Sequence, residues 1–461
     1  MNPHRIPLVG LRVRPIDRLL SPIQSFLEIE AAGGLLLLLF TVLALVWANS
    51  PWSASYEKLW HGTYLGLNLF DKADGSSLFD LRMSLGHWVN DGVMAIFFFV
   101  VGLEIKREVL VGGLSSPKQA AVPIAAAIGG ILFPALIYVG VNLGAEGQAP
   151  KGWAIPTATD IAFALGIMAL LGKRVPLSLK IFLTALAIVD DIGAVLIIAF
   201  FYTEGLDTTA LLSGGIVLAL LVACNFLHVR RLLVYILLGA LLWYFVYKSG
   251  IHATIAGVLL AFTIPARTRM DGLAFSNFGK KAMDLYTEAG GDRDQIMADP
   301  VRQKLVHGIE QASEAVQPPL LRLEHILHPW SAFLIMPVFA LANAGVAIGD
   351  LSVIFTSSIS LGILLGLVVG KQVGVSLFTW LAVRLGLGHL PAGTTFRQIY
   401  ATSWLAGIGF TMSLFIAGLG LGTGEDLERA KMGILFASLV AGVMGYLLLR
   451  LFSTPPSSEQ A

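Results

Sequence analysis

Charged residues are scarce in this sequence. Asp, Glu, Lys and Arg make up 13% of the 461 residues, whereas hydrophobic residues make up 56%. Soluble domains carry about 25% charged residues, so this composition cannot supply a water-facing surface. The formal net charge of +1 lacks the basic excess that a nucleic-acid partner requires. The single cysteine, Cys224, excludes an intrachain disulfide and says nothing about redox compartment. The sequence therefore predicts a protein solvated mainly by the lipid bilayer.

Long apolar runs are plentiful. A helix that crosses a bilayer needs about 20 mainly apolar residues. Five such runs contain no charged residue at all, and they alone exclude a soluble fold: 31–48, 208–229, 351–370, 398–424 and 432–449. When isolated charges are allowed, about twelve transmembrane helices are predicted near 31–48, 88–106, 120–143, 152–171, 177–203, 208–227, 231–247, 249–265, 327–348, 355–383, 398–420 and 430–450. The first run follows Glu28 and Glu30 rather than a short basic region, so we interpret it as a retained span and not a signal peptide.

The positions of Lys and Arg predict the orientation. With the N-terminus inside, 23 of the 31 Lys and Arg residues fall in inner segments and 7 in outer ones, and Lys371 lies within a span. Inner loops of membrane proteins carry such an excess. We therefore expect both termini in the cytoplasm, with residues 1–30 as an N-terminal segment and 451–461 as a tail.

Two connections between spans differ from the rest. Within residues 56–81, Leu65, Leu67 and Leu69 alternate with other residues before a bend at Asp74-Gly75, which predicts a small periplasmic β-hairpin. Residues 266–321 mix charges of both signs with Gly and Pro, which predicts a mobile or weakly helical cytoplasmic insert. A spacer without function is the alternative for this insert.

Four ionisable residues lie midway along predicted spans. Asp160 is in the fourth span, Asp190 and Asp191 are in the fifth, and Lys371 is in the tenth. A charge at mid-bilayer costs at least about 2.5–3.5 kcal/mol on insertion scales, so such residues face protein or water and usually serve function. Adjacent helix residues point about 100° apart; one aspartate can therefore pair with Lys371 while the other faces an ion path. A purely structural salt-bridge cluster is the alternative.

Two spans contain helix-breaking residues at comparable depth. Pro156 precedes two threonines and Asp160 in the fourth span, and Gly407 and Gly409 precede Thr411 in the eleventh. Proline removes a backbone donor, and nearby hydroxyls can bond the freed carbonyls. Interruptions in corresponding places of two halves indicate a transporter site, although each alone is also compatible with a packing kink.

Six strings carry a resemblance to a known family. They are VGLEIKRE at 101–108, ATDIAFALG at 158–166, ALAIVDDIG at 185–193, SGIHATIAG at 249–257, RLEHILHPW at 322–330 and GK at 370–371. Over about residues 31–450 the chain resembles the NhaA sodium/proton antiporters of bacteria. The resemblance implies an all-α protein of the bacterial inner membrane with inverted-topology repeats in spans three to five and ten to twelve. It also implies that spans four and eleven cross as discontinuous helices and that a homodimer forms through the hairpin.

The resemblance implies roles for named residues. Asp190 and Asp191 bind the transported Na⁺ and protons, Lys371 pairs with Asp190, and Thr159 and Asp160 belong to the crossing. Seven residues match positions linked to pH response at the cytoplasmic side: Glu104, Arg107, Glu108, His252, Glu324, His325 and His328. The N-terminal extension and the 266–321 insert depart from the family pattern, which bears on regulation rather than on transport.

These observations predict a secondary transporter and not an enzyme. Hard monovalent ions prefer oxygen ligands, so Na⁺ (or Li⁺) and H⁺ would compete for the same carboxylates without a cofactor. The resemblance implies electrogenic export of one Na⁺ for two protons, with a role in sodium and pH homeostasis. Two rivals remain: a sodium-coupled solute symporter of the same architecture, and a non-transporting subunit that lines a proton path in a membrane complex.

Overall fold

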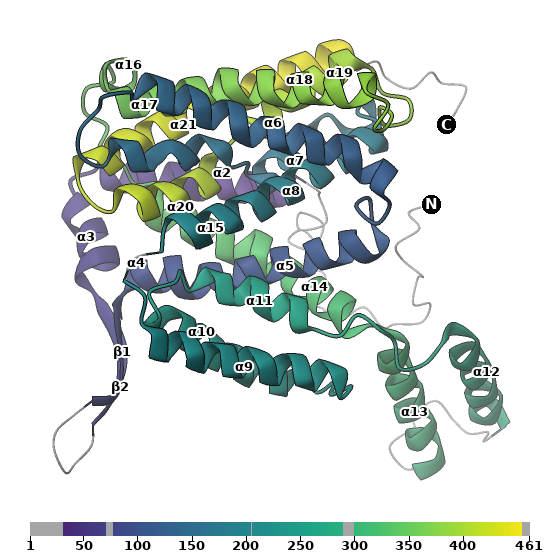
Figure 1. Ribbon diagram of the computed structural model, residues 1–461. Helices are drawn as coiled ribbons and strands as arrows, with labels where there is room; N and C mark the ends of the chain where they lie inside the picture. The colour runs from purple at the N-terminus through teal and green to yellow at the C-terminus, as the bar shows by residue number, and fades with distance from the viewer. Residues whose placement is uncertain (1–30, 71–76, 204, 289–298, 454–461) are drawn as a thin grey trace.

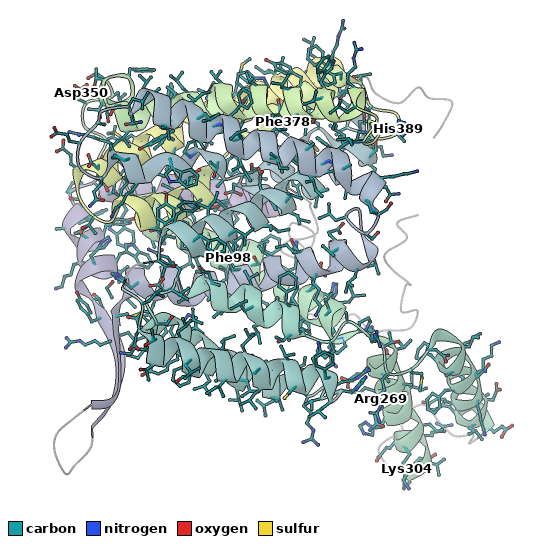
Figure 2. All side chains as sticks on the ribbon, in the orientation of Figure 1. Phe98, Arg269, Lys304, Asp350, Phe378 and His389 are labelled. Carbon is teal, nitrogen blue, oxygen red and sulfur yellow. The ribbon has the colours of Figure 1, made fainter. Side chains whose placement is uncertain are left out.

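The apolar runs form helices, because a helix satisfies all its backbone hydrogen bonds within one segment, as a bilayer demands. The computed structural model describes residues 31–70, 77–203, 205–288 and 299–453. Figure 1 shows the long helices side by side in one bundle. In Figure 2, Asp350 and His389 mark opposite ends of this bundle, and Phe98 lies between them.

The helices of the N-terminal half are α2 (Ala32–Ala48), α3 (Ser53–Glu57), α4 (Leu85–His87), α5 (Met94–Val111), α6 (Pro117–Val141), α7 (Ile161–Leu170), α8 (Leu177–Phe201), α9 (Thr208–Phe226), α10 (Leu232–Lys248) and α11 (Thr254–Thr263). Those of the C-terminal half are α12 (Gly272–Glu288), α13 (Pro300–Val316), α14 (Pro319–Trp330), α15 (Met336–Asn343), α16 (Val353–Thr356), α17 (Ser358–Leu365), α18 (Lys371–Arg384), α19 (Phe396–Ala406), α20 (Phe410–Leu421) and α21 (Glu425–Phe452). Segments of 3-10 or π geometry are η1 (Lys58–Gly62), η2 (Trp88–Val93), η3 (Ala149–Thr157), η4 (Gly172–Arg174), η5 (Ser331–Ile335) and η6 (Gly366–Gly370), and the strands are β1 (Tyr64–Phe70) and β2 (Ser77–Ser84).

The described residues contain seven helices long and apolar enough to cross a membrane, or nine when each of two bent pairs counts as one span. Helices α10 and α11 are also apolar but shorter, and α5 carries charges near its end. Each of the twelve predicted spans overlaps one of these helices. The chain is thus a largely helical, multi-pass membrane protein, while the number twelve stays a prediction.

Two helical segments are interrupted at the depth the sequence indicates. The 3-10 segment η3, which contains Pro156, ends at Thr157, and α7 begins at Ile161. Gly407 ends α19, Gly409 precedes α20, and the two helices are bent by 45° at this break. These interruptions free backbone groups and helix ends in the middle of the bundle.

Helix α18 is held against α6 by backbone contact. Four glycines at every fourth position of the continuous segment α17–η6–α18 face α6: a Cβ added at any of them would meet α6 or the residue that caps it. They are Gly362, Gly366, Gly370 and Gly374. A Cβ added at Gly374 would lie 2.0 Å from the carbonyl oxygen of Gly129 on α6. Small residues at this spacing let membrane helices approach closely. The contact fixes the height of Lys371, which lies within this glycine series.

The hairpin is shorter than predicted at its start. Residues 53–62 are helical, and β1 begins only at Tyr64. The two strands pair antiparallel from Tyr64 with Ser84 to Phe70 with Ser77, and Figure 1 shows them projecting from the bundle. The predicted bend at Asp74-Gly75 lies outside the described residues, as do all of the predicted N-terminal segment and residues 454–461 of the predicted C-terminal tail.

The insert is more regular than predicted. The described part of 266–321 contains two helices of 17 residues each, α12 and α13, so the expectation of weak helicity was wrong. They lie apart from the main bundle at the end away from the hairpin (Figure 1). Arg302 on α13 packs over the Tyr286 ring of α12 at 5.0 Å, a contact between distant residues that periodicity within one segment does not reveal.

Candidate ion-binding site

Asp160 connects the two interrupted helices. It is the N-cap of α7, and its Oδ1 accepts a hydrogen bond from the Phe163 backbone N–H at 2.9 Å. Its Oδ2 accepts from the backbone N–H of Thr411 at 3.2 Å and from the Thr411 hydroxyl. The Asp160 N–H donates to the Ile408 carbonyl oxygen at 2.7 Å. Because helix N-termini carry partial positive charge, the starts of α7 and α20 compensate this buried carboxylate.

Lys371 pairs with Asp190 in the bundle interior, where both side chains are fully buried. Its Nζ lies 2.5 Å from Asp190 Oδ2 and donates to Thr159 Oγ1 at 3.0 Å. The Thr159 hydroxyl lies 2.7 Å from the same Asp190 oxygen and 2.8 Å from the Ala406 carbonyl oxygen, and its single proton serves one of them. Helices α8 and α18 and the two interruptions therefore meet at this ion pair.

Asp191 is a buried carboxylate that lies within electrostatic reach of Lys371 but has no hydrogen-bond partner of its own in the described structure. Its side chain is 1% exposed, and neither carboxylate oxygen has a hydrogen-bond partner within the described residues; Oδ1 of Asp190 also lacks one. Asp190, Glu104 and Asp160 lie within electrostatic reach and add further negative charge. Burying an unpaired charge is expensive, so this position attracts a cation or a proton.

The charges at this site can now be assigned to partners. Lys371 neutralises Asp190, and helix ends compensate Asp160, which leaves Asp191 as the carboxylate without a partner. The ligands available nearby are carboxylate, hydroxyl and carbonyl oxygens, which suit a hard cation. The described residues contain no cluster of three or more His, Cys, Asp or Glu side chains suited to a resident metal.

A second charged cluster lies near the C-terminal end of α5. Arg107 contacts Glu324 of α14 at 2.5 Å and Glu108 at 2.9 Å. Glu108 also accepts from the Gly113 backbone N–H at 2.8 Å. Glu104, one turn earlier on α5, lies within electrostatic reach of Glu324, Arg107 and Glu108 as well as of Asp191. Glu104 therefore stands between the two charged groups.

Two of the three predicted histidines lie near this cluster: His325 is within electrostatic reach of Glu324, and His328 is within reach of Arg107. His325 and His328 are exposed on α14. His252 lies before α11 and approaches Asp91 at 4.0 Å. Asp91 and Arg107 are 16 residues apart on η2 and α5, which corresponds to about 24 Å along a helix. His252 lies at the end of α5 opposite Arg107, because α11 packs against α5, and its role in pH response stays a prediction.

The sequence reasoning missed two polar partners. Thr411 bonds Asp160 across the crossing, and its place two residues after Gly409 in an interrupted span was an available signal. Asp91 is a half-buried carboxylate that also lies within a predicted span and was not counted among the buried charges. Asp91 lies only a few residues after the predicted start of this span, so the sequence did not distinguish it from a residue at the membrane surface.

A helical membrane protein with carboxylates, a lysine and two interrupted helices at one depth belongs to the class of ion-coupled transporters. The sequence profile described as Na⁺/H⁺ antiporter 1 matches residues 24–449. The chain therefore belongs to this Na⁺/H⁺ antiporter family.

Similar proteins cover the whole chain. The Na⁺/H⁺ antiporter NhaA of Oleidesulfovibrio alaskensis is 50% identical over 463 residues, which is 100% of both chains. The NhaA of Koribacter versatilis is 47% identical over 96% of this chain and 94% of its own. That of Acidithiobacillus ferrooxidans is 49% identical over 94% of this chain and 97% of its own.

Proposed function

We propose that this Na⁺/H⁺ antiporter binds the transported Na⁺ at Asp191 and Asp190 and exchanges it for protons carried by the same carboxylates. The observation that carries the proposal is the buried Asp191 carboxylate, whose two oxygens have no hydrogen-bond partner in the described structure. Either Na⁺ or H⁺ neutralises it, and the two compete. Li⁺, also a small hard cation, is bound by the same oxygens.

Exchange follows from this competition. Protons entering from the periplasmic side displace Na⁺ at the carboxylates, and their release to the cytoplasm opens the site to the next Na⁺. Two carboxylates can carry two protons for one Na⁺, so each cycle moves one net positive charge inward and the proton gradient drives Na⁺ export. Sodium and pH homeostasis is the physiological role that we infer.

Lys371 and Asp160 position the charges of this site. When Na⁺ is coordinated by the oxygens of Asp190, the ammonium of Lys371 keeps its hydrogen bond to Thr159 and stays within the bundle. The starts of α7 and α20 hold Asp160 as a fixed negative charge. Because helix ends carry partial charges, a small movement of either interrupted helix changes the field at Asp191.

We extend the proposal to regulation and assembly. The residues Glu104, Arg107, Glu108 and Glu324 are proposed to respond to cytoplasmic pH, supported by the Arg107–Glu324 contact and by the position of Glu104 between this cluster and Asp191. For His325 and His328 the proposal is supported by their electrostatic reach to Glu324 and Arg107, and for His252 it rests on sequence resemblance. We also propose that the chain has twelve spans with inverted repeats and crossing interruptions, and that both termini are cytoplasmic. The protein resides in the bacterial inner membrane and forms a homodimer through the periplasmic hairpin.

Proteoliposomes test the function directly. The purified chain alone, in vesicles with an internal pH dye, should move protons when Na⁺ is added outside, without any organic solute or partner subunit. A requirement for a solute would favour a symporter. A requirement for other subunits would favour a proton-path component.

A further inference from the structure

An apolar groove runs along the outside of the bundle between α2 and α21, with α7 beneath it. It encloses about 610 Å³. Leu35 and Leu38 line one wall, and Leu439, Val443 and Leu447 line the other, with exposed fractions between 41% and 63%. The α21 wall runs from residue 432 to 447, about 22 Å along a helix. This length exceeds one leaflet of a bilayer core of about 30 Å.

The floor of the groove is the back of the ion-site crossing. Phe163 and Phe410 both line it, with ring centroids 5.6 Å apart. Three residues with hydroxyl groups line the groove: Thr41, Ser438 and Tyr446. Ser438 Oγ accepts from the Phe410 N–H at 3.1 Å, and Thr41 donates to the Leu37 carbonyl oxygen at 2.7 Å. Neither needs a polar partner from a ligand, so the groove suits a hydrocarbon chain.

One end of the groove is basic. Leu170 and Leu447 line this end. Lys173 and Arg174 follow Leu170 at the end of α7, and Arg450 follows Leu447 by three residues on the same face of α21. All three side chains are exposed. The sequence contains no Asp or Glu between 161 and 189 or between 429 and 453, so no acidic residue of these segments offsets the positive charge.

We propose that this groove binds an acyl chain of an anionic phospholipid whose phosphate is held by Lys173, Arg174 and Arg450. Clusters of basic residues beside membrane helices attract anionic headgroups, and the proposed orientation places this end at the cytoplasmic leaflet. The bound chain covers Phe163 and Phe410, so the lipid braces the crossing from the side opposite Asp190.

Charge favours this occupant over a second copy of the chain. A two-fold interface brings the same patch of both subunits together, and Lys173, Arg174 and Arg450 would then face their own copies. Like charges facing each other oppose association. A lipid phosphate instead neutralises them.

Lipid titration of the full-length purified chain tests the proposal. Native mass spectrometry would count bound phosphatidylglycerol and phosphatidylcholine with the same acyl chains. Val443→Trp fills the groove, and the double variant K173Q/R450Q removes headgroup charge. Leu237→Trp, which changes an exposed residue of α10, and Lys118→Gln are the matched controls.

We expect Val443→Trp to lose the tightly bound phosphatidylglycerol, whereas Leu237→Trp keeps it. K173Q/R450Q should lower phosphatidylglycerol affinity about five-fold for each charge removed, since each is worth about 1 kcal/mol near the membrane surface, and should leave only the advantage over phosphatidylcholine that Arg174 supplies. Lys118→Gln should leave both affinities unchanged. Unaltered binding in Val443→Trp would overturn the proposal. Increased phosphatidylglycerol binding after removal of residues 1–28 would also overturn it, because that segment would then be the occupant of the groove. Equal competition by inorganic phosphate would overturn it as well, because the basic residues would then bind a free anion.

Discussion

The two charged clusters of this transporter differ in how their charges are balanced. At the candidate ion-binding site, Lys371 and Asp190 are fully buried, and Asp191 has no hydrogen-bond partner in the described structure. At the end of α5, Arg107 is 34% exposed and is shared between Glu108 and Glu324. The first cluster can be neutralised only by a bound ion or proton, whereas in the second water reaches Arg107 but not the buried Glu324, whose Oε2 has no hydrogen-bond partner in the described structure. An unpaired charge in the interior therefore suits ion binding and transport, whereas a partly hydrated charge network suits control of the transport rate by pH.

Asp191→Asn should have the largest effect, because it removes the unpaired charge with little change in volume. We expect Na⁺/H⁺ exchange in proteoliposomes to fall to background, with folding and membrane insertion intact. Asp207→Asn is the matched control, since Asp207 caps α9 at an exposed position and Asn is an equally good cap. Exchange near the wild-type rate in Asp191→Asn would remove this residue from the site.

Breaking the buried pair should reduce stability as well as transport. Lys371→Ala leaves Asp190 as a second unpaired carboxylate, and loss of one partner of a buried pair costs about 3–5 kcal/mol. Asp190→Asn should also inactivate the transporter and lower its thermal unfolding temperature. Lys118→Ala, at an exposed position, should do neither. Unfolding temperatures that match the wild type in both pair variants would argue against the Lys371–Asp190 contact.

Glu324→Gln should change pH control and leave the maximum rate largely intact. Removing this negative charge makes proton binding by its neighbours less favourable, so the acid limit of activity should move to lower pH by about one unit. The limit should be measured at several Na⁺ concentrations, with Glu146→Gln as an exposed control. If competition at Asp191 alone sets the limit, raising Na⁺ will shift it continuously and Glu324→Gln will follow the wild-type curve.

The hairpin should have the smallest influence on transport. Deleting its tip, residues 71–76, should weaken dimerisation, because exposed strand edges pair across subunits. Exchange should persist, since the ion-binding residues come from one chain. Crosslinking and native gels would measure the dimer fraction, and an unchanged fraction would place the interface elsewhere.

Charge and apolar length were the strongest sequence signals. Asp160, Asp190, Asp191 and Lys371 were recognisable because charges are rare in apolar runs, and they meet in the structure. The partner of each charged residue was harder to predict, because the sequence does not show which of the two adjacent aspartates faces Lys371. The position of His252 depends on how α11 packs against α5, which no local pattern encodes. The helices of the insert depend in part on contacts between them.

The contact between Gly129 and Gly374 also bears on how the transporter can move. Where these two glycines meet, no side chain separates α6 from α18, and the Phe133 and Phe378 rings pack against each other beside the contact, so sliding or tilting would force closely packed groups together. We therefore expect these two helices to travel as one rigid unit, with Lys371 attached to it. We expect the displacement that opens the site alternately to each side of the membrane to arise at the two interruptions, which are joined by the bond from the Asp160 N–H to the Ile408 carbonyl oxygen and by the bonds from Thr411 to the Asp160 carboxylate. The glycine series thus predicts that α6 and α18 form a rigid unit and that α7 and α20 move relative to it.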